Sequence, residues 1–405
     1  MLRAEIEALE RSLERDAGNF TGVPRDPIVR PPMRLVSPVA KAGEAIMEVF
    51  EQYAAENPKG VKRDTLNQAR RDVELFVQVV GTTHPTTSIC KEDVRNWKKL
   101  LIEYPVKAAE AKVFRSLTLG EIVAANAAVG KPVITSRTVN RHLANLGAFC
   151  TWLVNNGYLD QNPVNGMRLH KEVKVKPDVF TSEQLTRLFS SPLFVGCQAE
   201  DRPSLIHLPG DIRIRDHRYW VPVIMLLTGA RPGEIGQLTV NDVRQNLDTW
   251  VFDINDDDPT TKSLKRPSAR RLVPIHKNLI DIGLLTYREH QIDKGETQLF
   301  PKAVRNSRGQ MLADLSRFFP RYLSALGIRE GQRYSLYSFR HGAIDALRRA
   351  EYLDHEIAFL VGQGSKTVTA GYGATQEGTI NRRATMINAI DYGIDLSHLK
   401  PASPQ

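Results

Sequence analysis

The sequence contains little cysteine and no long apolar run. Its 405 residues include only three cysteines, Cys90, Cys150 and Cys197. Because these are odd in number, far apart and free of any Cys-x-x-Cys pair, they predict neither a disulfide framework nor a thiolate metal site, and we expect ordinary reduced thiols in the core. No stretch approaches the roughly 18 apolar residues that span a bilayer, since the most apolar run, 220–227, has the length of a buried element.

The N-terminal stretch also lacks the features of a secretory signal. Glu5, Glu7 and Glu10 place charges where such a signal would carry its apolar segment, which leads us to expect a cytoplasmic protein. Residues 1–40 begin with a short charged helical candidate and then contain five prolines. We therefore expect an extended N-terminal lead-in there.

Acidic residues are fewer than basic ones. The chain has 55 Lys and Arg against 46 Asp and Glu, a formal net charge of +9. This balance favours polyanionic partners, because a protein that neutralises backbone phosphates releases condensed counterions. Many basic proteins do not bind nucleic acid, so charge alone does not decide between the two.

A length of 405 residues predicts two domains with tails, since one domain usually has about 100 to 200 residues. The first half is helical over 41–170: apolar residues recur at spacings of three and four in 61–80, 94–104 and 139–153. The third of these helices has a polar side that is consistent both with a solvated face and with a helical module that has one basic face. This polar side carries Arg137, Asn140, Arg141 and His142.

The two halves are separated by a segment without a helical pattern. Residues 171–177 hold three lysines, among them Lys174 and Lys176, and end in a proline, which predicts an interdomain linker. Thr181 and Gln184 then form the capping-box pattern that begins a helix.

The second half mixes helical periods with two alternating runs. The runs 250–254 and 271–275 predict strands. A polar connection between them holds Lys262, Lys265 and Arg266.

Two arginines of the second half stand in motifs that suit phosphate binding. The segment 228–234 presents Arg231 just after an apolar helix, with Glu234 three residues later to orient its planar fork of donors. The segment 337–341 presents Arg340 near the start of another helix. Each motif alone also has an ordinary interpretation, a helix start or a surface pair.

A tyrosine lies between glycines in a third motif. Tyr372 stands nine residues beyond Gln363 and is flanked by Gly371 and Gly373. This setting predicts an exposed and mobile side chain, although a surface aromatic in a loop has the same pattern.

Taken in this order, with a basic hairpin between the first two, the three motifs resemble those of tyrosine recombinases of the phage-integrase type. The resemblance covers most of the chain. It implies a mainly helical protein with a small sheet, in which an all-helical, SAM-like core-binding domain over 41–170 precedes an α+β catalytic domain over 178–385 and a C-terminal tail over 386–405.

The resemblance assigns the catalytic residues one position at a time. Arg231 and Arg340 match the two arginines of the family, Glu234 matches the acidic residue that supports the first of them, and Tyr372 matches the nucleophile. Lys262 matches the family lysine best. Lys265 is the alternative, because the hairpin is longer than usual.

Two positions depart from the family pattern. Tyr337 stands where the family usually has histidine, and Gln363 stands where it usually has histidine or tryptophan. Both replacements keep a hydrogen-bond donor, but no imidazole remains at the scissile phosphate unless His341, which usually has a packing role, supplies one. We therefore expect chemistry that is slower but not abolished.

The resemblance also implies the partners. These are double-stranded DNA and further copies of the chain in a tetrameric synapse on DNA, with accessory DNA-bending proteins as an additional candidate and no membrane. We expect the DNA contacts to come from the helical domain, the linker and the hairpin. The residues are Arg137, Asn140, Arg141, Lys174, Lys176 and Lys265.

The implied activity is site-specific cleavage and rejoining of DNA through a 3′-phosphotyrosine, as in DNA integration or excision. The arginines would stabilise the charge on the phosphate, and the lysine would protonate the leaving 5′ oxygen. No metal or cofactor is expected, because side chains supply the positive charge and the phosphotyrosine conserves the bond energy. Two other functions are open: a DNA-binding protein on the same scaffold whose catalysis has decayed, and a type IB topoisomerase.

The end of the chain predicts one more helix. Apolar residues recur at spacings of three and four over 380–392, and Gly393 is its expected stop. In the family such a tail packs on a neighbouring protomer. Coverage of its own domain is equally consistent with the pattern.

Overall fold

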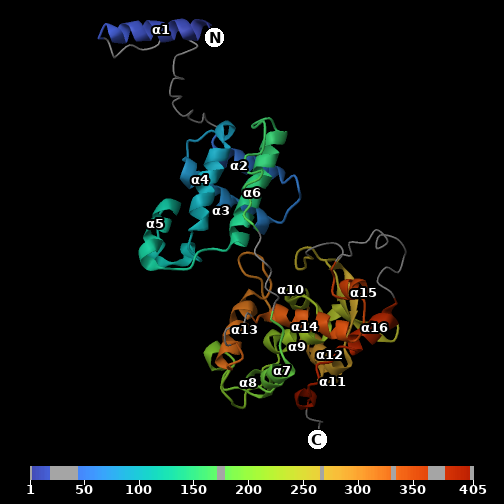
Figure 1. The fold of residues 1–405 in the computed structure, drawn as a ribbon. Coiled ribbons are helices and arrows are strands. Elements are labelled where there is room, and N and C mark those ends of the chain that lie inside the picture. The colour runs from blue at the N-terminus through green and yellow to red at the C-terminus, as the bar shows by residue number, and fades with distance from the viewer. Residues whose placement is uncertain are drawn as a thin grey trace. The chain divides into compact units, whose positions relative to one another are not determined.

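The computed structural model describes residues 2–18, 44–170, 178–264, 269–329, 334–363 and 379–401. The chain divides into two compact units, Met1–Lys174 and Val175–Gln405, which Figure 1 shows as ribbons. The division falls within the predicted linker, which itself lies outside the described residues.

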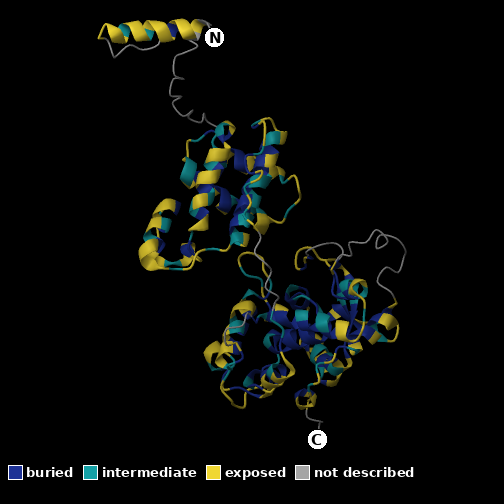
Figure 2. Ribbon diagram, in the orientation of Figure 1, coloured by how far each residue is buried: buried dark blue, intermediate teal, exposed yellow. Residues whose placement is uncertain are grey.

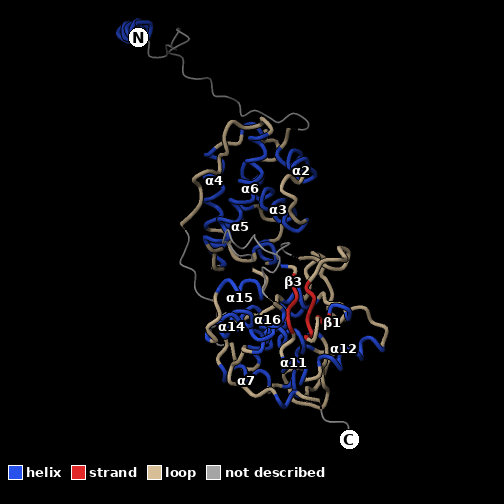
Figure 3. The backbone as a smooth tube through the Cα atoms, turned by 90° about the vertical axis from the view of Figure 1, so that its right-hand side faces the viewer, coloured by secondary structure: helices blue, strands red, loops and turns tan. Residues whose placement is uncertain are grey.

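The described part of the N-terminal unit is helical (Figure 3). The amphipathic patterns of the sequence fall on its third, fourth and sixth helices, whose apolar residues are buried. Phe50, Trp97 and Phe149 are among the largest fully buried side chains. The α-helices of this unit are α1 (Leu2–Asp16), α2 (Ile46–Glu56), α3 (Arg63–Val80), α4 (Lys91–Ile102), α5 (Leu119–Val129) and α6 (Ser136–Asn155).

A buried carboxylate joins α3 to α6. Asp72 is 1% exposed and accepts hydrogen bonds from Nη1 of Arg141 at 3.1 Å and from Nδ2 of Asn145 at 2.6 Å, while Nδ1 of His142 lies 2.9 Å from its Oδ1. Burial raises the pKa of Asp72, but the hydrogen bond and charge of His142 and the charge of Arg141 outweigh burial and hold it below the ordinary value. Part of the polar side of α6 therefore serves helix packing.

The C-terminal unit combines helices with one small sheet. Its strands β1 (Val243–Asn246), β2 (Thr249–Ile254) and β3 (Arg271–Pro274) form an antiparallel sheet in that order, with Phe252 opposite Val243 on one side and Val273 on the other. The predicted fold class, mainly helical with a small sheet, is confirmed. The α-helices are α7 (Ser182–Phe189), α8 (Pro192–Val195), α9 (His217–Thr228), α10 (Pro232–Gly236), α11 (Lys277–Asp281), α12 (Leu284–Asp293), α13 (Ala313–Ala325), α14 (Leu336–Arg349), α15 (Asp354–Leu360) and α16 (Ile380–Asn388).

Two helices form the centre of this unit. α9 packs against α14 and is buried from Tyr219 to its end, as the dark blue interior of Figure 2 shows. Asp216 caps the N-terminus of α9 by accepting the backbone N–H of Arg218 at 2.8 Å. Because α9 is surrounded by the core, the turn that follows it is held firmly against α14.

Described residues of the predicted C-terminal tail, 386–405, pack into the core of the same unit. α16 packs on β3, and Nη1 of Arg383 donates to the carbonyl of Leu272 at 2.7 Å. The helix ends at Asn388, earlier than predicted. The chain then turns and half-buries Tyr392, whose hydroxyl donates to the carbonyl of Leu226 at 2.8 Å. The core continues to Leu399, so the described part of this segment covers its own domain.

All three cysteines are free thiols. Cys150 and Cys197 are buried, as predicted, but Cys90 is exposed. The reason is its place at the start of α4, where its backbone N–H donates to Asp93 at 2.9 Å. Among the described residues, no helix has both the length and the apolar content that crossing a bilayer requires.

We predict a pH-dependent loss of stability that originates at His276. This residue is 1% exposed, and its Nδ1 accepts the backbone N–H of Asn278 at 3.0 Å at the start of α11. Burial lowers the pKa of His276 from 6.5 to about 4. Between these two pH values the unfolded chain binds a proton at His276 that the folded chain does not bind. The contribution of His276 to the free energy of unfolding is therefore fully present above pH 6.5 and decreases by about 3 kcal/mol as the pH falls to 4.

Urea denaturation at about pH 7 and about pH 4.5 measures this loss. His276→Asn keeps a capping acceptor and removes the ionisable group, so its stability should fall less than that of the wild type. His290→Asn changes an exposed histidine of α12 and should retain the wild-type loss. Equal losses in all three proteins would contradict the assignment.

Candidate active site

The turn after α9 brings three distant segments together. Gly229 ends the helix with a φ of 67°, a conformation that favours glycine. An added Cβ would lie 3.1 Å from Val361, just beyond α15, and 3.2 Å from Ala343 of α14. The close fit places the start of α10 beside both of these helices.

Arg231 follows this turn and is held by two partners. It caps α10, and Pro232 takes the first helical position. A backbone N–H at that position would have no partner within the helix, so a proline there removes no helical hydrogen bond. Nη1 of Arg231 donates to Oε1 of Glu234 at 2.6 Å, and Nη2 donates to the carbonyl of Gly362 at 2.8 Å. Glu234 thus orients the guanidinium toward the end of α15.

Arg340 reaches the same turn from α14. Its side chain is buried, and Nη1 donates to the carbonyl of Gly229 at 2.5 Å. Nη2 is also buried and has no hydrogen-bond partner among the described residues. Burial, followed by the nearby charge of Arg231, lowers the pKa of Arg340 to about 10. The site therefore contains a buried cation for which the described part of the chain supplies no ion-pair partner.

A third guanidinium, not singled out in the sequence, completes this group. Arg271 begins β3, is 4% exposed and donates to Oε2 of Glu234 at 2.9 Å and to the carbonyl of Leu360 at 2.8 Å. A signal for it was present: the alternation of 271–275 puts Arg271 on the same face as the buried Val273. A charge on the buried face of a strand requires a partner.

Arg231 and Arg271 thus share the carboxylate of Glu234, and the charge of Arg340 lies near both arginines. We name Arg231, Arg271, Arg340 and Glu234 the arginine cluster. Burial raises the pKa of Glu234, but Arg271 and Arg231 outweigh burial and hold it below the ordinary value, so the carboxylate stays ionised. The remaining excess of buried positive charge is costly unless an anion joins it. A phosphate suits this deficit, because guanidinium N–H groups match phosphate oxygens in charge and geometry.

Lys262 lies in a different environment. Its Nζ donates to Oδ1 of Asp242 at 2.7 Å and to Oδ1 of Asn255 at 2.9 Å, and the side chain is 8% exposed. Burial raises the pKa of Asp242, but the hydrogen bond from Lys262 leads a set of contacts that hold it below the ordinary value. Among the described residues, the hydrogen bonds of Lys262 do not reach the arginine cluster. Lys265 lies outside the described residues.

We predict that Lys262 contributes strongly to stability. Lys262→Met leaves the buried carboxylate of Asp242 without its ammonium partner, which should lower the free energy of unfolding by about 3 kcal/mol in urea denaturation. Lys277→Met replaces an exposed lysine at the start of α11 and should change it by less than about 0.5 kcal/mol. A Lys262→Met protein as stable as this control would contradict the buried ion pair.

Three of the other predicted site residues lie in the part of the chain that the structure describes. Tyr337 is 49% exposed, and Gln363 is exposed directly after Gly362. His341 is half-buried, and burial, followed by the charge of Arg340, lowers its pKa, which favours the neutral imidazole. Tyr372 lies outside the described residues.

The predicted DNA contacts differ in availability. Arg137 is exposed in the first turn of α6. Asn140 instead binds the backbone of Leu169, donating to its carbonyl at 3.0 Å and accepting its N–H at 2.8 Å, and Arg141 pairs with Asp72. Arg137 has an exposed side chain, and that of Arg141 is 40% exposed although it pairs with Asp72. Lys174, Lys176 and Lys265 lie outside the described residues.

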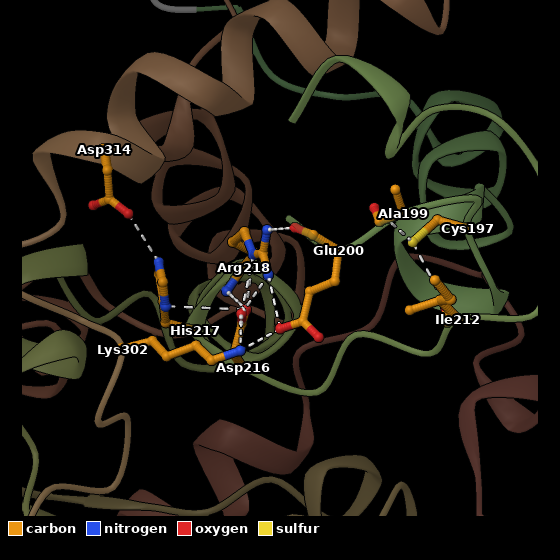
Figure 4. Close-up of polar contacts among 9 residues, drawn as sticks. All are labelled: Cys197, Ala199, Glu200, Ile212, Asp216, His217, Arg218, Lys302 and Asp314. Carbon is orange, nitrogen blue, oxygen red and sulfur yellow. Dashed lines mark hydrogen bonds and ion pairs between the residues drawn. The ribbon is translucent and has the colours of Figure 1, made fainter. Parts of the chain in front are cut away.

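A second polar cluster lies at the N-terminal end of α9, a helix about 18 Å long. Figure 4 shows its residues. Nη2 of Arg218 donates to Asp216 at 2.6 Å, His217 Nε2 lies 3.0 Å from Asp314, and Lys302 pairs with Glu200. A cavity of about 1120 Å³ borders this cluster. Because these basic groups have carboxylate partners, the cluster offers a phosphate less than the arginine cluster does.

Comparison with curated proteins finds relatives among recombinases, although no protein-family model matches the chain. The protein IntQ of Escherichia coli (strain K12), whose name describes it as defective, is 26% identical over 247 residues, 60% of this chain and 53% of its own length. Tyrosine recombinase XerC of Neisseria meningitidis serogroup C (strain 053442) is 25% identical over 42% of this chain and 50% of its own length. The chain thus spans about half the length of these two relatives.

Solved structures share the fold. A lambda integrase tetramer bound to a Holliday junction matches with a TM-score of 0.51 and 13% identity, over 89% of this chain and 88% of its own. The Tn1549 transposon integrase in complex with a circular intermediate DNA matches with a TM-score of 0.50 and 14% identity, over 85% of this chain and 98% of its own. Identities this low show the fold alone. The chain is thus similar in sequence to tyrosine recombinases, and it shares the fold of the lambda and Tn1549 integrases.

Proposed function

We propose that this protein is a site-specific DNA recombinase that cleaves and rejoins DNA strands through a 3′-phosphotyrosine intermediate, with Tyr372 as the nucleophile. The observation that carries the proposal is Nη2 of Arg340, which is buried near the charge of Arg231 and has no hydrogen-bond partner within the described ranges. A scissile phosphate placed there would complete the charge balance of the arginine cluster. The folded protein thus keeps donors ready for an anion before the anion arrives, which is how preorganised electrostatics lowers a barrier.

The reaction assigns a role to each group. The phenol oxygen of Tyr372 attacks phosphorus, and the bond from phosphorus to the 5′ oxygen breaks. Negative charge that develops on the nonbridging oxygens is stabilised by Arg231 and Arg340. The phenol proton passes to solvent, helped by the cationic surroundings that favour phenolate, and a lysine delivers a proton to the departing 5′ oxygen. Attack of a 5′ hydroxyl on the phosphotyrosine reverses these steps and rejoins the strand.

The net charge, one exposed arginine and a structural neighbour together support DNA as the partner. The chain carries a net +9, and Arg137 is exposed on α6. The lambda integrase that shares this fold was solved as a tetramer on a Holliday junction. We therefore propose double-stranded DNA as the substrate and a homo-oligomer on DNA as the active assembly, in which strands are exchanged stepwise.

A nicked suicide substrate tests the proposed function. Duplexes that the protein binds are selected from a random pool. For each candidate scissile phosphate, a substrate is made with a nick one to three nucleotides away, so that the short fragment with the free 5′ hydroxyl diffuses away after cleavage. The wild type should form an adduct that resists denaturant. Binding without any adduct would instead favour a DNA-binding protein with decayed catalysis, for which Tyr337 and Gln363 are the sequence support. Relaxation of random supercoiled plasmid would favour a topoisomerase.

The same assay identifies the lysine that acts as the acid. A substrate whose 5′ bridging oxygen is replaced by sulfur has a leaving group that needs no proton. Of Lys262→Met and Lys265→Met, the variant that removes the acid should cleave the ordinary substrate poorly and the sulfur substrate at the wild-type rate. If neither variant is slow on the ordinary substrate and restored by the sulfur substrate, the acid is not one of these lysines.

A further inference from the structure

Arg271 bonds to three separate parts of the chain around the arginine cluster. Nε donates to the carbonyl of Leu360 at 2.8 Å, Nη1 to the carbonyl of Ala269 at 2.7 Å and Nη2 to Oε2 of Glu234 at 2.9 Å. The side chain is 2% exposed, so water does not compete for these bonds. In sequence these partners are 89, 2 and 37 residues away, which makes Arg271 a long-range connection.

The guanidinium also occupies the space beside Gly362. This glycine has a φ of 67°, and an added Cβ would lie 2.4 Å from Nη1 and 2.8 Å from Cζ of Arg271. Arg231 donates to the carbonyl of the same glycine at 2.8 Å. Two arginines thus hold the turn after α15, one through Leu360 and the other through Gly362.

This turn lies where the segment of the proposed nucleophile begins. Gln363 follows it directly, and Tyr372 is nine residues further along the chain. The same Arg271 holds Glu234, whose other oxygen orients Arg231. The orientation of Arg231 and the origin of the Tyr372 segment therefore depend on one side chain.

We propose that Arg271 is a positioning residue for DNA cleavage. It acts through Glu234 and through the turn at Leu360 to Gly362, which it keeps in a fixed relation to the phosphate donors. This proposal rests on the proposed function for its catalytic part. A displacement of about 1 Å in a reacting group is enough to lower a rate about 100-fold, so loss of this connection should appear in the chemical step.

Arg271→Lys tests the proposal because it keeps the charge but puts all of its donors on one nitrogen, which cannot reach the three partners that Nε, Nη1 and Nη2 of the planar guanidinium reach. We expect the rate of adduct formation at saturating DNA to fall about 100-fold, while the Kd for DNA changes less than about threefold. The matched control is Arg270→Lys. Arg270 is the preceding residue, has a side chain that is 52% exposed and pairs with Asp257, so its variant should keep the wild-type rate.

A second readout does not depend on cleavage. Amide hydrogen exchange at 357–363 should be faster in Arg271→Lys than in the wild type, because the carbonyl of Leu360 loses its anchor. Arg270→Lys should exchange as the wild type does. Gly362→Ala provides another test if Arg271→Lys folds poorly: its methyl group must displace the guanidinium while Arg271 remains present, and it should reproduce the slower cleavage.

The outcomes separate this proposal from the proposed function. If Arg271→Lys and Gly362→Ala retain the wild-type rate and exchange, or if DNA affinity falls as much as the rate, the positioning role is wrong. If the wild type forms no adduct on any duplex that it binds, the proposed function fails. The exchange comparison then still decides whether Arg271 holds the turn: faster exchange supports that role, and unchanged exchange overturns it.

Discussion

Replacing Tyr372 with phenylalanine is expected to abolish covalent attachment to DNA without weakening DNA binding. The phenol oxygen forms the new bond to phosphorus. The arginine cluster cannot replace it, because the guanidiniums are protonated throughout and the carboxylate of Glu234 is held by Arg231 and Arg271. We expect the rate of adduct formation on the suicide substrate to fall at least about 10⁴-fold. Denaturing gels measure the adduct, and a mobility shift measures binding.

The matched control is Tyr352→Phe. Tyr352 packs its ring under Arg382, with 4.9 Å from the guanidinium carbon to the ring centroid, a contact that phenylalanine keeps. This variant should form adduct as the wild type does. Undiminished adduct in Tyr372→Phe would show that another residue attacks the DNA.

Arg340→Met is expected to lower the rate of DNA cleavage and to raise the free energy of unfolding. The cation is buried, has an unpaired Nη2 and lies near the like charge of Arg231, so the folded protein without DNA carries a cost that methionine removes. We expect the free energy of unfolding to rise by about 1 kcal/mol, after the lost bond to Gly229 is counted. Cleavage should fall at least about 1000-fold, because the variant lacks donors aimed at the phosphate.

Inorganic phosphate provides a direct check of the same idea. An anion that binds only the folded wild type raises its unfolding midpoint, and Arg340→Met should show little of this effect. Arg349→Met, which changes an exposed arginine of the same helix, should leave stability, cleavage and the phosphate effect unchanged. Strong destabilisation of Arg340→Met, by more than about 2 kcal/mol, would mean that the fold satisfies this charge without an anion.

The helices with long amphipathic patterns could be predicted from the sequence because burial of one face decides their formation. α3 and α6 are examples, since their apolar stripes are the buried residues of the structure. β1 had no such pattern. Its four residues bury only Val243 fully and form a strand because they pair with β2, a contact that local periodicity does not contain.

The site shows the same division between local and distant contacts. Arg231 and Glu234 are three residues apart, so their ion pair could be predicted from spacing. Arg271 donates hydrogen bonds to Glu234 and Leu360, which are 37 and 89 residues away. These bonds form only because the fold brings the start of β3 to the end of α15. The ion pair of Lys262 with Asp242, 20 residues away, could not be predicted from the sequence for the same reason.

The measurement that tests the central claim most directly is mass spectrometry of the trapped adduct. The wild type is reacted with a suicide substrate, the adduct is digested with protease and nuclease, and the peptide that carries the nucleotide is sequenced. We predict one modified peptide, with the 3′ phosphate on the oxygen of Tyr372. A nucleotide on any other residue, or firmly bound DNA that never becomes attached, would contradict the account.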